Sequence, residues 1–177
     1  MNDVCPIALI GYRGTGKTTV AQLLARRLGW DWVDADVEVE LRAGKSIAAI
    51  FTDEGEPAFR DLEAEVVAEL CGRECCVLAL GGGAILRETN RRGIATCQAV
   101  VWLRASAEVL AERIAQDATT AARRPNLTNH GGRTEIEADF VDVHRHGRGL
   151  LRQATVSSWF VECHAGGVAP GAPLDEW

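Results

Sequence analysis

The segment GYRGTGKT, residues 11–18, constrains this chain more than any other stretch of it. It has the Walker A spacing and lies between an apolar run, PIALI, and a helical pattern, TTVAQLLARRLG. In such a loop, backbone N–H groups and the positive end of the next helix bind phosphate oxygens. A Gly-rich turn without a ligand is the alternative, but packing gives no reason for its lysine and hydroxyl to occur together. We expect a nucleotide site formed by Gly11, Gly14, Thr15, Gly16, Lys17, Thr18 and Thr19.

Short apolar runs alternate with helical patterns along the chain, and this alternation predicts the fold class. The runs are PIALI, WDWV, CCVLAL and QAVVWL, and a helical pattern follows each of them. Such alternation is typical of βαβ units, so we expect an α/β fold with a parallel β-sheet and helices on both faces. In the first helical pattern, Val20, Leu23, Leu24 and Leu28 fall on one stripe, and Gly29 follows as a C-cap.

Composition excludes several kinds of partner. The chain has 177 residues and a formal net charge of −6, and its lysines are Lys17 and Lys45, so no basic face for nucleic acid is evident. No apolar run reaches the roughly 20 residues of a membrane span, and the N-terminus lacks the features of a signal peptide. We expect a cytoplasmic monomer that contacts neither nucleic acid nor membrane. The six cysteines are expected to be reduced and mostly buried, and a zinc site among Cys71, Cys75 and Cys76 is disfavoured.

Two absences indicate which kind of nucleotide-binding protein this is. A guanine-reading Asn-Lys-x-Asp motif cannot exist, because lysine occurs only at positions 17 and 45. The run VLALGGG ends in glycines where many ATPases place a strand-terminal aspartate that binds magnesium. Both absences favour a small-molecule kinase over a GTPase or a motor ATPase.

Three further motifs carry polar groups or glycines, and each has a structural alternative. Asp34 and Asp36 would share a face if their strand persisted, and the alternative is a helix N-cap. Arg60 and Glu63 lie three apart, so the glutamate can orient the guanidinium, although an exposed ion pair gives the same spacing. The glycines at 81–83 indicate close approach to the backbone or a plain strand-to-helix turn.

These motifs together resemble the shikimate kinase family. The segments GYRGTGKTT, DAD, GKSIAAIFTDEGEPAFRDLE, LALGGGAI and RRPNL stand in the family's order and approximate spacing, from about Pro6 to about Leu127. The resemblance implies a P-loop kinase of the nucleoside monophosphate kinase type with a lid. It also implies that ATP, with Mg²⁺, phosphorylates the 3-hydroxyl of shikimate. A related kinase such as a gluconate kinase and an inactive nucleotide-binding homologue remain the alternatives.

The resemblance also implies a role for individual residues. On the nucleotide side, Thr18 and Asp34 hold Mg²⁺, and Arg113 lies against the adenine. On the acceptor side, Asp36 binds the hydroxyl as the candidate base and Arg60 grips the carboxylate. The glycines implied to line the substrate pocket are Gly81, Gly82 and Gly83.

The lid and the C-terminal part of the chain complete the prediction. Residues 117–133 lack apolar periodicity and are expected to form the lid. The resemblance implies that Arg124 in this lid closes on the transferring phosphate and acts in catalysis with Lys17 and Asp36. From about Ala138 the chain departs from the family, which has there a second carboxylate-binding arginine. Arg148, or as second choice Arg145, is expected to replace it. Genuine divergence and an altered reading frame both explain the departure.

The last strand is expected in ATVSSWFV, within a single domain at 1–163. Residues 164–177 are expected to be a disordered tail.

Overall fold

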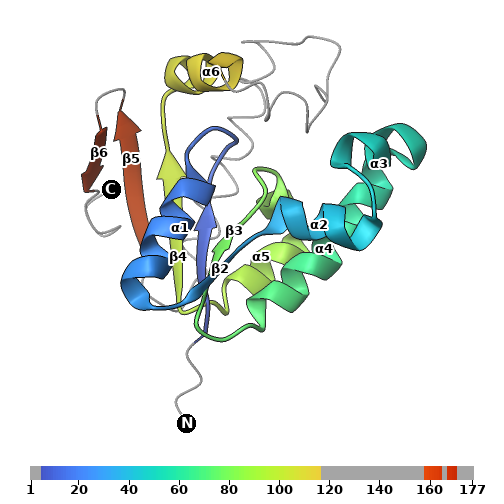
Figure 1. Ribbon diagram of the computed structural model, residues 1–177, viewed down its shortest axis with the longest axis horizontal. Coiled ribbons are helices and arrows are strands. Elements are labelled where there is room, and N and C mark those ends of the chain that lie inside the picture. The colour runs from blue at the N-terminus through green and yellow to red at the C-terminus, as the bar shows by residue number, and fades with distance from the viewer. Residues whose placement is uncertain (1–4, 117–157, 165–166, 171–177) are drawn as a thin grey trace.

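One mixed β-sheet forms the centre of the molecule (Figure 1). The computed structural model describes residues 5–116 and, further on, the backbone of residues 158–164 and 167–170. The sheet order is β2-β3-β1-β4-β5-β6, and every neighbouring pair is parallel except β5 with β6. The strands are β1 (Ile7–Ile10), β2 (Asp31–Asp34), β3 (Cys76–Ala79), β4 (Ala99–Arg104), β5 (Ser158–His164) and β6 (Gly167–Pro170).

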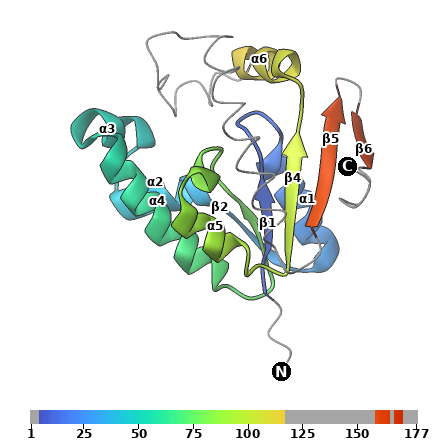
Figure 2. The same cartoon turned by 180° about the vertical axis from the view of Figure 1, so that it is seen from behind.

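Helices cover both faces of this sheet, as the sequence predicts. Figures 1 and 2 show α1 on one face and α4 with α5 on the other. The helices α2 and α3 lie on the same side of the sheet as α4. The helix α6 lies beyond the carboxyl ends of the strands. The helices are α1 (Lys17–Leu28), α2 (Ala35–Ala43), α3 (Ile47–Asp53), α4 (Gly55–Cys71), the 3₁₀ turn η1 (Ala84–Leu86), α5 (Glu88–Ile94) and α6 (Ala107–Gln116). None of these helices, within the described part of the chain, is long and apolar enough to cross a membrane.

The strands contribute side chains to two separate apolar clusters, one on each face of the sheet. Alternate residues of a strand point to opposite faces, so Leu9 joins the cluster under α1 while Ala8 and Ile10 join the larger one. The larger cluster includes Phe59 and Val66 of α4. A parallel strand buried on both faces needs apolar residues at every position, which explains runs such as IALI and CVLA.

The apolar stripe predicted for α1 is wrong in its phase. Leu23 and Leu28 are 55% and 42% exposed, whereas the residues of α1 that are buried are Ala21 and Ala25. Small side chains let the helix lie close to the sheet, and Val20 and Leu24 only flank that contact. The predicted cap is confirmed, because Gly29 adopts the left-handed conformation and its N–H donates to the Ala25 carbonyl.

The C-terminal strands extend the sheet past the predicted domain boundary at residue 163. β5 overlaps the predicted last strand and pairs in parallel with β4. The prediction of disorder from residue 164 fails for residues 167–170, because β6 pairs with β5 through a register that includes His164 and Gly167. An edge strand leaves a row of backbone groups open, and the added strand satisfies those of β5.

Candidate active site

The loop between β1 and α1 has the backbone shape of a phosphate-binding loop. Gly11, Gly14 and Gly16 have φ values of +140°, +79° and +89°, which residues with side chains rarely adopt. A Cβ on Gly11 would lie 2.2 Å from the carbonyl oxygen of Leu103, at the end of β4. The glycine at position 11 is therefore required by the close approach of β4, and the one at position 16 by the left-handed turn that begins α1.

Two side chains hold this loop closed on itself. Lys17 Nζ donates to the carbonyl oxygens of Gly11 and Tyr12, at 2.8 and 2.9 Å. Thr15 Oγ1 donates to the same Tyr12 carbonyl at 2.8 Å, and Thr15 is only 2% exposed. The ammonium group thus lies across the loop, where bound phosphate oxygens would meet it.

The predicted metal ligands Thr18 and Asp34 are brought together by the fold. Thr18 Oγ1 donates to Asp34 Oδ2 at 2.7 Å, so the hydroxyl at the start of α1 meets the carboxylate at the end of β2. A hydroxyl and a carboxylate are oxygen donors of the kind that Mg²⁺ prefers when nucleotide phosphates and water complete its shell. The described residues contain no cluster of three or more His, Cys, Asp or Glu side chains that could hold a metal alone.

The DAD motif does not continue the strand, so its two aspartates do not share a strand face, and the alternative of a helix N-cap is confirmed. β2 ends at Asp34, and α2 begins at Ala35. Asp34 is the N-cap of α2, and its Oδ1 accepts the backbone N–H of Asp36 at 3.0 Å. Asp34 therefore serves both as the cap and as the partner of Thr18, while Asp36 stands in the first turn of α2.

Arg60 and Glu63 form a buried pair on α4, which excludes an exposed helical ion pair. Arg60 is 8% exposed and Glu63 1%, and Arg60 Nη1 donates to Glu63 Oε2 at 2.8 Å. Glu56, which the sequence reasoning missed, accepts from both Nε and Nη2 of Arg60 at 3.2 Å. Its i, i+4 spacing to Arg60 is the signal that could have identified it. The guanidinium also lies over the ring of Phe59, 5.2 Å from its centroid.

The glycine segment 81–83 connects the phosphate loop with Arg60. A Cβ on Gly82 would lie 3.1 Å from the backbone nitrogen of Arg13, within the loop. A Cβ on Gly83 would lie 2.7 and 2.8 Å from Nη1 and Nη2 of Arg60. The segment also makes a turn, because the N–H of Ala84 donates to the Gly81 carbonyl at 3.0 Å. Both interpretations of these glycines therefore hold.

The helix α6 packs against the other side of the loop. Arg113 Nη1 donates to the Gly14 carbonyl at 3.2 Å, and a Cβ on Gly14 would lie 3.3 Å from Ile114. Arg113 therefore borders the nucleotide side of the site. The predicted lid at 117–133, and with it Arg124, lies outside the described residues, as does Arg148.

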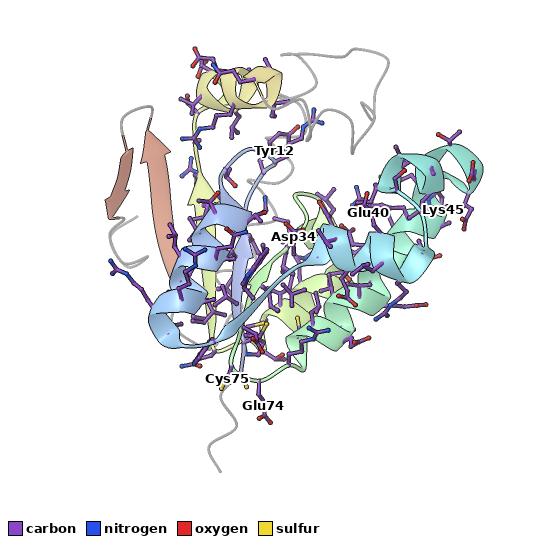
Figure 3. The ribbon with its side chains drawn as sticks, in the orientation of Figure 1. Tyr12, Asp34, Glu40, Lys45, Glu74 and Cys75 are labelled. Atoms are coloured by element: carbon purple, nitrogen blue, oxygen red, sulfur yellow. The ribbon has the colours of Figure 1, made fainter. Side chains whose placement is uncertain are left out.

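An ion-pair cluster joins the turn between α2 and α3 to the end of α3. Lys45, in the turn between the two helices, pairs with Glu54 at 2.6 Å and with Asp53 at 3.0 Å. The pKa of Lys45 is raised, mainly by its hydrogen bond to Glu54 and secondly by its hydrogen bond to Asp53. Figure 3 shows Lys45 in this turn and Glu40 on α2, and Tyr12 with Asp34 at the edge of the sheet where the strands end. Glu40 Oε1 accepts the N–H of Ile47 at 3.1 Å, at the start of α3.

Comparison with known proteins places this site in a defined family. The family model described as shikimate kinase matches residues 13–146. A shikimate kinase of Rhodopirellula baltica is 51% identical over 130 residues, covering 73% of this chain and 70% of that protein. A shikimate kinase of Nitratidesulfovibrio vulgaris is 39% identical over 153 residues, covering 86% of this chain and 85% of that protein.

A solved structure agrees with the sequence relatives. Shikimate kinase from Acinetobacter baumannii in complex with shikimate has a TM-score of 0.77 and 34% identity, covering 83% of this chain and 80% of that one.

Proposed function

Because this chain belongs to the shikimate kinase family, we propose that it transfers the terminal phosphoryl group of ATP to the 3-hydroxyl of shikimate. The products are ADP and shikimate 3-phosphate. The proposal makes the chain an ATP-dependent phosphotransferase acting on an alcohol. It also assigns the chain to the route of aromatic amino acid biosynthesis that consumes shikimate.

The contact of one short segment with both halves of the site supports the proposal most directly. Gly82 packs against the phosphate loop at Arg13, and its neighbour Gly83 packs against the guanidinium of Arg60. A cation for an acidic acceptor therefore stands one residue from the contact with the nucleotide loop. Phosphoryl transfer depends mainly on holding donor and acceptor in line, and this rigid spacing provides it.

The guanidinium of Arg60 is oriented by its protein partners before an acceptor carboxylate binds. Glu63 and Glu56 accept hydrogen bonds from Nη1, Nε and Nη2 of Arg60, and these three donors do not exhaust the five N–H groups of a guanidinium. In a buried site, a guanidinium fixed by two partners pairs with the acceptor carboxylate at little entropic cost. The planar fork of Arg60 selects an acidic acceptor over a neutral sugar.

Lys17 acts on the donor phosphates, and Asp36 acts on the acceptor hydroxyl. We assign Lys17 Nζ to the outer phosphate oxygens, which replace the Gly11 and Tyr12 carbonyls as its partners. Thr18, and Asp34 through water, would hold Mg²⁺, which would supply positive charge beside the phosphates. Asp36 receives or orients the proton of the acceptor hydroxyl from the first turn of α2.

The remaining assignments extend the proposal. We assign Gly14, Thr15, Gly16 and Thr19 to the phosphates, Arg113 to the adenine, and Arg124 in a lid at 117–133 to the transferring phosphate. Arg148 is proposed as the second contact to the acceptor carboxylate. We propose that the chain acts as a monomer in the cytoplasm.

An ADP-release assay tests the proposal. The full chain is incubated with ATP and Mg²⁺, and ADP is measured without acceptor, with shikimate and with gluconate. We expect release that depends on shikimate and a phosphorylated product of matching mass. Release with gluconate alone would indicate a sugar-acid kinase of the same fold. Nucleotide binding without release in any arm would indicate an inactive homologue, and either result would overturn the proposal.

A further inference from the structure

Two cysteine side chains face each other at the end of the sheet where the parallel strands begin, opposite the phosphate loop. Cys71 is the last residue of α4, and Cys97 lies just before β4. Their sulfur atoms are 3.9 Å apart although the residues are separated by 26 positions in the chain. Figure 3 shows Cys75, directly before β3, far from Tyr12 and Asp34 at the other end of the sheet. The pair therefore takes no part in the nucleotide and acceptor site.

We propose that Cys71 and Cys97 form an intramolecular disulfide in the folded protein when a small disulfide such as oxidised glutathione, or a peroxide, oxidises them. The bond needs the two sulfurs to approach from 3.9 Å to about 2.05 Å. Cys71 is the last residue of α4, so the approach requires movement at the end of the helix and not within it.

The surroundings of Cys71 leave room for that approach. A Cβ on Gly93 of α5 would lie 3.8 Å from the sulfur of Cys71, so the glycine leaves open the space beside it. Gly72 follows Cys71 directly and ends α4, and its N–H donates to the carbonyls of Glu69 and Leu70. No side chain at position 93 therefore occupies the space beside the sulfur of Cys71.

The two thiols differ in exposure and in acidity, which assigns them different roles. Cys71 is partly exposed and Cys97 is buried, so a reagent in solution meets Cys71 first. Cys97 donates its S–H to the sulfur of Cys71, and this hydrogen bond lowers the pKa of Cys71. The pKa of Cys97 is raised, mainly by the same hydrogen bond and secondly by its burial. Cys71 is therefore the attacking thiolate and Cys97 the thiol that completes the bond.

One small disulfide is consumed for each protein disulfide that forms. The Cys71 thiolate attacks one sulfur of the small disulfide, forms a mixed disulfide and expels one thiolate. That thiolate takes the proton of Cys97, whose sulfur then attacks the sulfur of Cys71 and expels the second small thiolate. Two protein thiols are oxidised, and the small disulfide is reduced to two thiols. A peroxide reaches the same product through a sulfenic acid on Cys71 with loss of water.

The new bond would join the far end of α4 to the segment that enters β4. Cys71 is eleven residues from Arg60 along the helix, or about 16 Å. A cross-link at that end closes a loop of moderate length in the unfolded chain, which raises the melting temperature by several degrees. It leaves the Arg60 end of α4 untouched.

Peptide mapping of the oxidised full-length chain tests the proposal. The native protein is treated with oxidised glutathione, remaining thiols are blocked, and tryptic peptides are analysed without reduction. Cleavage after Arg73 separates Cys71 from Cys75 and Cys76, and cleavage after Arg92 isolates Cys97, so a Cys71–Cys97 pair differs in mass from any pair that contains Cys75 or Cys76. We expect a Cys71–Cys97 peptide pair that disappears on reduction, and a melting temperature about 5 °C above that of the reduced protein.

Three variants separate this pair from the other thiols. Cys71→Ser and Cys97→Ser should each abolish the linked peptide and the rise in melting temperature. Cys75→Ser is the matched control, since it removes an exposed thiol at the same edge and should change neither. A linked peptide that joins Cys97 to Cys5 would overturn the proposal. So would glutathione retained on Cys71 of the native chain, or a Cys71–Cys97 link that forms only after denaturation.

Discussion

Thr18 and Asp34, sixteen positions apart in the chain, meet through a hydrogen bond of 2.7 Å from Oγ1 to Oδ2. One residue belongs to the first turn of α1 and the other ends β2, so the contact depends on the parallel packing of the first βαβ unit. Because Asp34 also caps α2, the same carboxylate supports the fold and contacts the Thr18 hydroxyl, which we propose as a Mg²⁺ ligand. The two roles can be separated by experiment.

Replacement of Asp34 by Asn should reduce turnover and leave the fold intact. The amide caps a helix nearly as well as a carboxylate does, but it does not carry the charge that Mg²⁺ requires. We expect kcat to fall by about 100-fold, with a higher Mg²⁺ requirement and an unchanged melting temperature. The control is Asp34→Ala, which should lose turnover and also about 1 kcal/mol of stability with the cap. Wild-type turnover of Asp34→Asn at ordinary Mg²⁺ concentrations would show that the carboxylate has no metal role.

The two lysines of the chain provide a matched pair of variants. Lys17→Ala removes the ammonium group that lies across the phosphate loop, and we expect kcat to fall by about 1000-fold while the protein remains folded. Lys45→Ala removes only the exposed ion pairs with Asp53 and Glu54, so turnover should stay within about threefold of wild type. Steady-state kinetics and circular dichroism measure both effects. Equal losses in the two variants would argue against a specific role for Lys17.

Alanine at Gly83 and at Gly82 should affect different substrates. The added methyl group at position 83 would press on the guanidinium of Arg60, so the KM for shikimate should rise about tenfold while that for ATP stays near wild type. At position 82 it would approach the backbone nitrogen of Arg13, so the KM for ATP should rise instead. Both constants are measured for both variants. A rise in the same constant in each would contradict the proposed division of the segment.

Loss of Arg60 should cost stability as well as acceptor binding. Arg60→Ala would leave the carboxylate of Glu63, which is 1% exposed, without its buried cationic partner. We expect the free energy of unfolding to fall by about 3 kcal/mol. In the double variant Arg60→Leu/Glu63→Leu the loss should be smaller, because no buried charge remains. Urea unfolding of both variants and of Arg60→Leu gives the comparison. Equal stability of the Arg60→Leu and double variants would show that Glu63 does not depend on Arg60.

Replacement of the C-terminal arginines should weaken binding of the acceptor and leave binding of ATP unchanged. If Arg148 provides the second contact to the shikimate carboxylate, Arg148→Ala should raise the KM for shikimate about tenfold and leave that for ATP unchanged. Arg145→Ala is the control for general loss of charge nearby, and a larger effect there would transfer the role to Arg145. If neither constant changes, no arginine of this region contacts the acceptor.

The sequence by itself determined the fold class and the backbone form of the loop at residues 11–18. The Walker A spacing and the alternation of apolar runs with helical patterns are local properties of the chain, and they predicted the phosphate loop, the parallel order and the helices on both faces. The cap at Gly29 followed from the same local rules. These predictions hold because backbone geometry and side-chain period act over a few residues.

Only the tertiary structure decided how distant residues meet. The predicted buried face of α1 was wrong, because the helix lies close to the sheet and therefore buries Ala21 and Ala25 in place of Leu23 and Leu28. The local sequence does not encode this close approach. The end of β2 at Asp34, the packing of Gly83 on Arg60 and the facing sulfurs of Cys71 and Cys97 are likewise contacts between elements. Periodicity within a segment carries no information about which neighbour it will meet, because that depends on the volumes and positions of residues elsewhere in the chain.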